Sequence, residues 1–162
     1  IDMTLRAVLR PGDEVLIPEP CFVCYAPLAT LMGATPVSVE TKAEDGFRLT
    51  AKGLREAITK RTRALIFPFP SNPTGAVMRR EHLEEIAAVL RDTDILVITD
   101  EVYGELTYGD KPHESIAAID GMWERTVRIS GFSKAFAMTG WRLGYVAAPA
   151  EIDDAMFKIH QL

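Results

Sequence analysis

Apolar residues at helical spacing alternate along the chain with short, continuous apolar runs. The helical spacing predicts helices, and the continuous runs predict strands that are buried on both faces. The predicted helices are residues 1–9, 25–32, 50–58, 80–91 and 151–160. The predicted strands are residues 14–17, 34–39, 63–67, 95–98, 127–129 and 143–148. Strands that alternate with helices indicate βαβ units, so the expected fold class is α/β, with a mainly parallel sheet and helices on both faces.

Turn-forming residues define several ends of these elements. Pro18 and Pro20 are expected to end the strand at residues 14–17. Thr50 is the expected N-cap of the helix at residues 50–58. Residues 68–75, with the sequence PFPSNPTG, are dense in turn residues and predict a rigid loop after a buried strand.

Three side chains that can carry chemistry follow predicted strands. Asn72 comes after the strand at residues 63–67, Asp100 after 95–98, and Lys134 after 127–129. Loops at the carboxyl ends of parallel strands are where ligands bind in such sheets. We therefore expect these three side chains to lie at one edge of the sheet.

The composition argues against several functional classes. The chain has 162 residues, of which 48% are hydrophobic and 25% charged, as in one globular domain. A net charge of -5 and the lack of a basic tract argue against a nucleic-acid partner. No apolar run approaches the ~20 residues of a membrane span. The sequence has neither G-x-G-x-x-G after a strand nor a Walker-type phosphate loop, which argues against a dinucleotide-binding domain.

The two cysteines, Cys21 and Cys24, have a spacing that occurs in redox pairs and zinc sites. No second cysteine pair accompanies them, and the histidines show no metal spacing. The pair also lacks the helix start that a redox motif uses. We therefore expect no metal site and two free thiols, which fits a cytoplasmic location.

Residues 130–145, with the sequence SGFSKAFAMTGWRLGY, are the most informative stretch. They place Lys134 among small and hydroxyl residues, with Arg142 eight residues later. An amine that acts as a nucleophile needs a crowded, partly dry loop, and an anion site needs a fixed guanidinium. A surface loop with two ordinary exposed cations would also explain this stretch of sequence. The interpretation therefore depends on three stretches upstream, which are EPCFVCY with Phe22, PSNPTG with Asn72, and ITDEVYGEL with Asp100 and Tyr103.

In this order and spacing, the four stretches resemble the large domain of fold-type I pyridoxal phosphate enzymes, specifically the class I and II aminotransferases. The resemblance covers essentially the whole chain, and FSKAFAMTGWRLGY is its most specific part. It implies pyridoxal 5'-phosphate as the cofactor, which the protein must hold and orient while tuning its ring nitrogen. It also implies ping-pong transamination between an amino acid and a 2-oxo acid.

The resemblance implies catalytic roles for Lys134, Asp100 and Tyr103. Lys134 matches the lysine that forms an aldimine with the cofactor and later moves the proton at the substrate Cα. Asp100 matches the carboxylate that pairs with the pyridine nitrogen and keeps it protonated. Tyr103 and Asn72 match the pair that hydrogen-bonds the phenolic oxygen. From the residues alone, Asp100 as a helix N-cap, Asn72 as a turn residue and Tyr103 as a core residue remain open.

The remaining cofactor-binding residues that the resemblance implies are Phe22, Arg142 and a serine. Phe22 matches the ring that stacks on the pyridine, with core burial as the alternative. Arg142 matches the arginine that binds the phosphate. Many family members have a serine three residues before the lysine, where this chain has Gly131. We expect Ser133, rather than Ser130, to replace it.

The resemblance also predicts how the chain is organised. Residues 1–162 are expected to form one cofactor-binding large domain without the family's first phosphate loop, N-terminal arm and small domain. We expect such a piece to be inactive alone and the longer protein to be a homodimer. Two alternatives remain open, a fold-type I lyase or decarboxylase and an aminotransferase-like sensor domain of a transcription regulator. The regulator would carry a DNA-binding segment upstream of Ile1.

Overall fold

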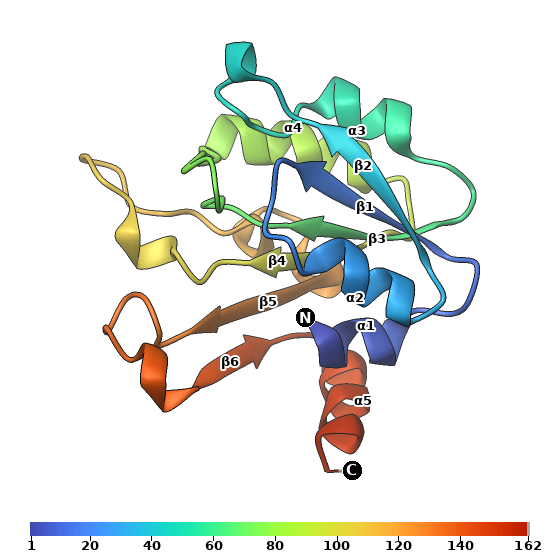
Figure 1. Cartoon of the computed structure of the whole chain (residues 1–162). Coiled ribbons are helices and arrows are strands. Elements are labelled where there is room, and N and C mark those ends of the chain that lie inside the picture. The colour runs from blue at the N-terminus through green and yellow to red at the C-terminus, as the bar shows by residue number, and fades with distance from the viewer. Residues whose placement is uncertain (162) are drawn as a thin grey trace.

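A computed structural model describes residues 1–161 (Figure 1). Its α-helices are α1 (Asp2–Val8), α2 (Tyr25–Leu31), α3 (Ala51–Ala57), α4 (Arg80–Leu90) and α5 (Ala150–His160). Its strands are β1 (Glu14–Glu19), β2 (Thr35–Glu40), β3 (Thr62–Phe67), β4 (Leu96–Asp100), β5 (Thr126–Gly131) and β6 (Gly144–Ala147). Short 3-10 turns include η2 (Gly104–Leu106), η3 (Ile116–Ala118) and η5 (Thr139–Trp141). Each predicted helix and strand is present within a few residues of its expected bounds.

The strands form one six-stranded sheet in the order β2-β1-β3-β4-β5-β6. Strands β1 to β5 run parallel to one another, whereas β6 runs antiparallel to β5. The predicted mainly parallel α/β fold is confirmed. Because β6 runs back along β5, residues 132–143 form a return at the carboxyl edge of the sheet (Figure 1). Both Lys134 and Arg142 therefore belong to that edge.

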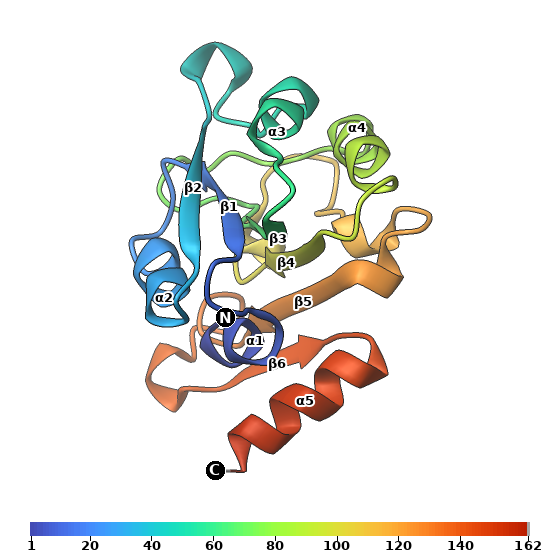
Figure 2. The ribbon, with the colours of Figure 1, turned by 90° about the vertical axis from the view of Figure 1, so that its right-hand side faces the viewer.

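Helices cover both faces of the sheet (Figure 2). Alternate residues of a strand point to opposite faces, so one continuous apolar run supplies two cores. In β3, Leu65 and Phe67 pack with α3 and α4, while Ala64 and Ile66 pack with α1 and α2. Helix α5 packs against α1 on this second face. Burial on both faces explains why the strands lack polar alternation.

Two local predictions about helices are confirmed. The Thr50 side chain accepts a hydrogen bond of 3.1 Å from the backbone N–H of Gly53, as an N-cap does. Helix α4 buries one face, formed by Leu83, Ile86, Ala87 and Leu90. The apolar face that the sequence predicts is the one that meets the sheet.

The predicted end of β1 is wrong. The strand passes through Pro18, which pairs with Val39, and continues to Glu19. On the other side, β3 pairs with β1 only as far as Leu16. A proline lacks the N–H that a strand ladder uses, but here one neighbouring strand has already diverged, so the lost donor interrupts no ladder on that side.

Within residues 1–161, no helix is both long enough and apolar enough to cross a membrane.

Candidate active site

The carboxyl ends of β3, β4 and β5 border a cavity of about 500 Å³. All seven residues that the sequence selects as site residues line it, although they come from four separate segments. They are Phe22, Asn72, Asp100, Tyr103, Ser133, Lys134 and Arg142. Parallel strands bring their carboxyl ends to the same edge, which is why residues far apart in sequence meet here. The roles that the resemblance implies for them stay predictions.

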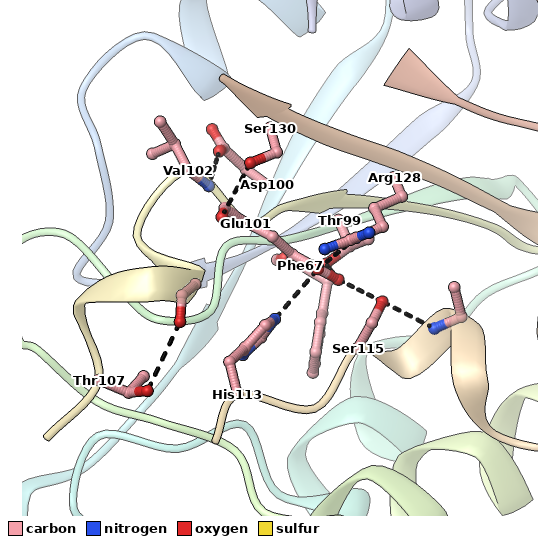
Figure 3. Close-up of polar contacts among 12 residues, drawn as sticks. Phe67, Thr99, Asp100, Glu101, Val102, Thr107, His113, Ser115, Arg128 and Ser130 are labelled. Carbon is pink, nitrogen blue, oxygen red and sulfur yellow. Dashed lines mark hydrogen bonds and ion pairs between the residues drawn. The ribbon is translucent and has the colours of Figure 1, made fainter. Parts of the chain in front are cut away.

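Asp100 is the last residue of β4 and is partly buried in the cavity wall. Its Oδ2 accepts a hydrogen bond of 2.8 Å from the Tyr25 hydroxyl. Its Oδ1 accepts a second bond of 3.3 Å from the backbone N–H of Val102 (Figure 3). The following helical turn, η2, begins after Tyr103, so Asp100 is not the N-cap that the sequence left open. Two donors therefore fix the direction of this carboxylate.

Tyr25 is a site residue that the sequence analysis missed. It lies at the start of α2, is 4% exposed and lines the same cavity. Burial, together with the charge of Asp100 and the hydrogen bond to it, raises the pKa of Tyr25 far above its ordinary value. The phenol therefore stays protonated and donates to Asp100. A tyrosine three residues after Phe22 is the only sequence signal for this role, and core packing explains that signal equally well.

Phe22 and Tyr25 form an edge-to-face aromatic pair, with ring centroids 5.9 Å apart and planes at 73°. The Phe22 side chain is 43% exposed, because one side of the ring faces the open cavity. This exposure argues against Phe22 as an ordinary core residue. The ring therefore has a free surface on which a flat group could stack.

Lys134 lies in the return between β5 and β6, with its Nζ 5.6 Å from the centroid of the Tyr103 ring. This distance is within the range of a cation–π contact. Lys134 is exposed in this structure, so the chain itself does not supply the dry surroundings that the sequence analysis expected around a nucleophilic amine. Lys134 and Tyr103 both line the cavity, so the amine lies beside the ring that follows β4.

The return between β5 and β6 also shapes the position of Arg142. Arg142 has a φ of 52°, a left-handed backbone that non-glycine residues adopt only under constraint. Its Nη1 donates a hydrogen bond of 3.1 Å to the Thr139 carbonyl. Backbone constraint of this kind is often found at functional sites. The guanidinium is thus held by its own loop while it lines the cavity.

The two candidate serines differ in their contacts. Both line the cavity, but the Ser130 hydroxyl donates a hydrogen bond of 3.3 Å to the carbonyl of Glu101, whereas Ser133 lies in the return itself. At Gly131, an added Cβ would lie 3.2 Å from the carbonyl oxygen of Leu143 on the returning chain. This close approach favours glycine at position 131, where the resemblance led us to expect a serine. The geometry is compatible with the expected use of Ser133.

Asn72 lies in the loop after β3, and two backbone hydrogen bonds of 2.9 Å close this loop. The donors are Ser71 N–H, to the Ala76 carbonyl, and Gly75 N–H, to the Ser71 carbonyl. Gly75 has a φ of 72°, which glycine adopts without strain. Asn72 is therefore both a turn residue and a cavity residue, so the two sequence interpretations are compatible.

The cysteines take no part in this cavity. Cys21 and Cys24 are both free, as expected. Burial, and then the charge of Glu19, raises the pKa of Cys21 to about 11, so its thiol is protonated at neutral pH and a poor nucleophile. Among residues 1–161, no group of three or more His, Cys, Asp or Glu side chains is arranged to hold a metal ion.

Known proteins with this sequence pattern have the same fold. The chain is 53% identical over 156 residues to an aspartate aminotransferase of Pyrococcus abyssi, covering 96% of this chain and 40% of that protein. It is 48% identical over 156 residues to aromatic-amino-acid aminotransferase 2 of Thermococcus litoralis, with coverage of 96% and 40%. The crystal structure of an aromatic aminotransferase from Pyrococcus horikoshii superimposes with a TM-score of 0.95 at 53% identity, covering 99% of this chain and 43% of that one.

The chain therefore spans about two fifths of the length of the relatives it matches. Over that span the similarity is continuous, and residues 1–162 match the family described as aminotransferase class I and II. The matched span includes every segment that lines the cavity. The chain belongs to the class I and II aminotransferase family.

Proposed function

We propose that this chain forms the cofactor-binding core of an aminotransferase that uses pyridoxal 5'-phosphate to exchange an amino group between an amino acid and a 2-oxo acid. The observation that carries the proposal is the meeting of Lys134, Asp100, Tyr103 and Arg142 in one cavity at the carboxyl edge of the sheet. These residues come from different segments, so their proximity is a property of the fold. A set of ordinary surface charges would not be expected to collect around one concave site.

The donors and acceptors around the cavity fit the chemical groups of this cofactor. Asp100 supplies a carboxylate for a protonated ring nitrogen, and its orientation is fixed by Tyr25. Phe22 offers an exposed aromatic face for a flat ring. Arg142 supplies a fork of N–H donors that suits a phosphate, with the Ser133 hydroxyl as a second donor. Asn72 and Tyr103 supply neutral donors for the phenolic oxygen.

The bound cofactor would supply an electron sink for the bond that breaks at the substrate Cα. Lys134 is the residue we assign to covalent attachment of the cofactor's aldehyde. Once released by the incoming amino acid, its amine is a base that can take the Cα proton and return it on the other side of the exchange. The direction of the Asp100 carboxylate is fixed by two hydrogen-bond donors. The carboxylate would stabilise the positive ring nitrogen during the whole reaction.

The relatives support transamination over the two alternatives. Relatives of similar identity are named for different amino acids, namely aspartate at 53% and aromatic amino acids at 48%, but all of these names specify amino-group transfer. These names favour transamination over a lyase, a decarboxylase or the sensor domain of a regulator. The proposal therefore concerns the class of reaction, with an amino acid and a 2-oxo acid as the two substrates.

Exposed apolar side chains lie on the chain segments that supply cavity residues. Val23 is 78% exposed, Trp141 71% and Phe136 62%. Apolar surface of this kind is typical of a covered interface. We propose that a second subunit of a homodimer and a further domain cover it, which would also enclose Lys134. The two free thiols support a cytoplasmic location.

The proposed activity is tested in a chimera, in which residues 1–162 replace the matching segment of the Pyrococcus abyssi aspartate aminotransferase. We expect the chimera to transfer the amino group of aspartate to 2-oxoglutarate with a kcat within about 10-fold of the unsubstituted enzyme, a margin of about 1.4 kcal/mol. The 162-residue chain alone should show no turnover, because enclosing and orienting the substrate supplies much of the rate. A folded chimera that binds the cofactor without turning over would contradict the proposal.

Covalent labelling tests the assignment of Lys134 without measuring activity. The chimera should turn yellow with pyridoxal phosphate. Borohydride should remove the absorbance band that gives this colour and should fix the cofactor to one lysine. Peptide mapping should place the label on Lys134. Lys111 and Lys158 serve as internal controls, because both are exposed and lie outside the cavity. A label distributed over several lysines, or located on either control, would exclude the assignment.

A further inference from the structure

Glu101 carries a buried carboxylate next to the candidate site that the proposed chemistry does not use. Its side chain is 1% exposed, and hydrogen-bond donors or cations from β4, β5 and the segment before η3 converge on it (Figure 3). Oε1 accepts bonds from the hydroxyls of Thr99 (3.2 Å) and Ser115, and Oε2 lies 2.6 Å from Arg128 Nε and 3.0 Å from His113 Nε2. The His113 contact is at ion-pair distance but off the direction of a hydrogen bond.

These contacts keep the carboxylate charged. Burial alone would raise the pKa of Glu101, but the contacts with His113, Ser115 and Arg128 outweigh burial and lower the pKa below its ordinary value. A buried charge is tolerated only while its partners stay in place, and removing the charge leaves those partners unsatisfied. The carboxylate therefore links three segments of the chain into one arrangement.

The backbone of Glu101 connects this arrangement to the cavity. Its N–H donates a bond of 2.8 Å to the Ile129 carbonyl of β5. Its own carbonyl accepts bonds from the Gly104 N–H (2.9 Å) and from the Ser130 hydroxyl (3.3 Å). Asp100 precedes Glu101 directly, and Tyr103 lies inside the turn that the Gly104 bond closes. A shift of Glu101 would therefore move both residues that face the proposed cofactor.

We propose that Glu101 is a positioning residue, whose buried carboxylate fixes Asp100 and Tyr103 by pinning the end of β4 to β5 and to residues 113–115. Glu101 does not line the cavity, whereas its neighbour Asp100 does, so the effect is transmitted through the backbone. This inference rests on the proposed function. It adds a residue whose contribution lies in orienting the site.

The test is the Glu101→Gln variant of the chimera. Glutamine preserves the shape and an acceptor for the hydroxyls but removes the charge that faces Arg128. We expect kcat to fall by about 10- to 100-fold, the loss typical of residues that orient a catalytic group, while KM changes by less than about 3-fold. An independent readout is the absorbance of bound pyridoxal phosphate, whose maximum and pH dependence should both shift.

Glu14→Gln is the matched control. Glu14 is also a buried carboxylate, held by Arg61 Nε at 2.9 Å and by the Thr59 hydroxyl. It lies at the start of β1, at the opposite edge of the sheet from the cavity. Both substitutions should lower the denaturant midpoint of unfolding. Only Glu101→Gln should change kcat and the cofactor spectrum.

A milder variant, His113→Gln, keeps a donor near Glu101 and decides the question if Glu101→Gln does not fold. We expect a kcat loss of about 3- to 10-fold, because one of the partners changes while Arg128 remains. If the folded variants match Glu14→Gln, with lower unfolding midpoints but unchanged kcat and spectrum, Glu101 is only structural and the inference is overturned. If the unsubstituted chimera fails to bind pyridoxal phosphate or to turn over, the proposed function fails and the inference with it.

Discussion

Replacing Lys134 with alanine in the chimera should lower kcat by about 10⁴-fold, because alanine neither attaches the cofactor nor moves a proton. Lys134 supplies the amine at this point of the cavity, beside the Tyr103 ring. Steady-state turnover of aspartate with 2-oxoglutarate gives the rate. The same variant should bind pyridoxal phosphate without the label that borohydride fixes in the parent chimera.

The controls for this prediction are Lys111→Ala and Lys158→Ala. Each removes one exposed amine that does not line the cavity, so each should retain the kcat of the parent chimera. The assignment of Lys134 would be wrong if Lys134→Ala kept turnover within about 10-fold of the parent, a difference of only about 1.4 kcal/mol.

Replacing Asp100 with asparagine should leave the cofactor bound but lower kcat by about 10²- to 10³-fold, or roughly 3–4 kcal/mol of transition-state stabilisation. Asparagine has nearly the shape of aspartate, and its amide oxygen can still accept the bond from Tyr25. It lacks the negative charge that would stabilise a protonated ring nitrogen. Turnover and cofactor titration, measured on the same preparation, separate the loss of rate from a loss of binding.

Asp94→Asn is the control for the Asp100 variant. This substitution makes the same chemical change at Asp94, an exposed residue between α4 and β4 that does not line the cavity. Its kcat should equal that of the parent chimera. A kcat for Asp100→Asn that also stays within about 10-fold of the parent would exclude Asp100 as the counter-charge.

The sequence by itself determined the layers of the fold and the edge of the sheet at which the site lies. Continuous apolar runs such as residues 63–67 require burial on both faces, so helices had to cover both sides. The order of strands and helices implied parallel pairing, and parallel strands place Asn72, Asp100 and Lys134 at one edge. These inferences depend on local periodicity and connection order, both of which can be read directly from the letters.

Only the tertiary structure decided which residues touch within that edge. The bond from Tyr25 to Asp100 joins residues that are 75 positions apart, and no local pattern specifies such a pair. In the sequence, Glu101 is indistinguishable from an ordinary acidic residue that follows a strand. Its burial against Arg128 and His113 depends on how β5 and residues 113–115 pack.

The tertiary structure also decided the direction of β6 and the passage of β1 through Pro18. The return of the chain after β5 places β6 antiparallel, and Gly131 and Gly144 allow the two strands to approach closely. Pro18 is tolerated because β3 has already diverged from β1. The physical reason is the same in each case. A periodic pattern determines which face a residue presents, whereas a contact between distant segments depends on how whole elements pack in three dimensions.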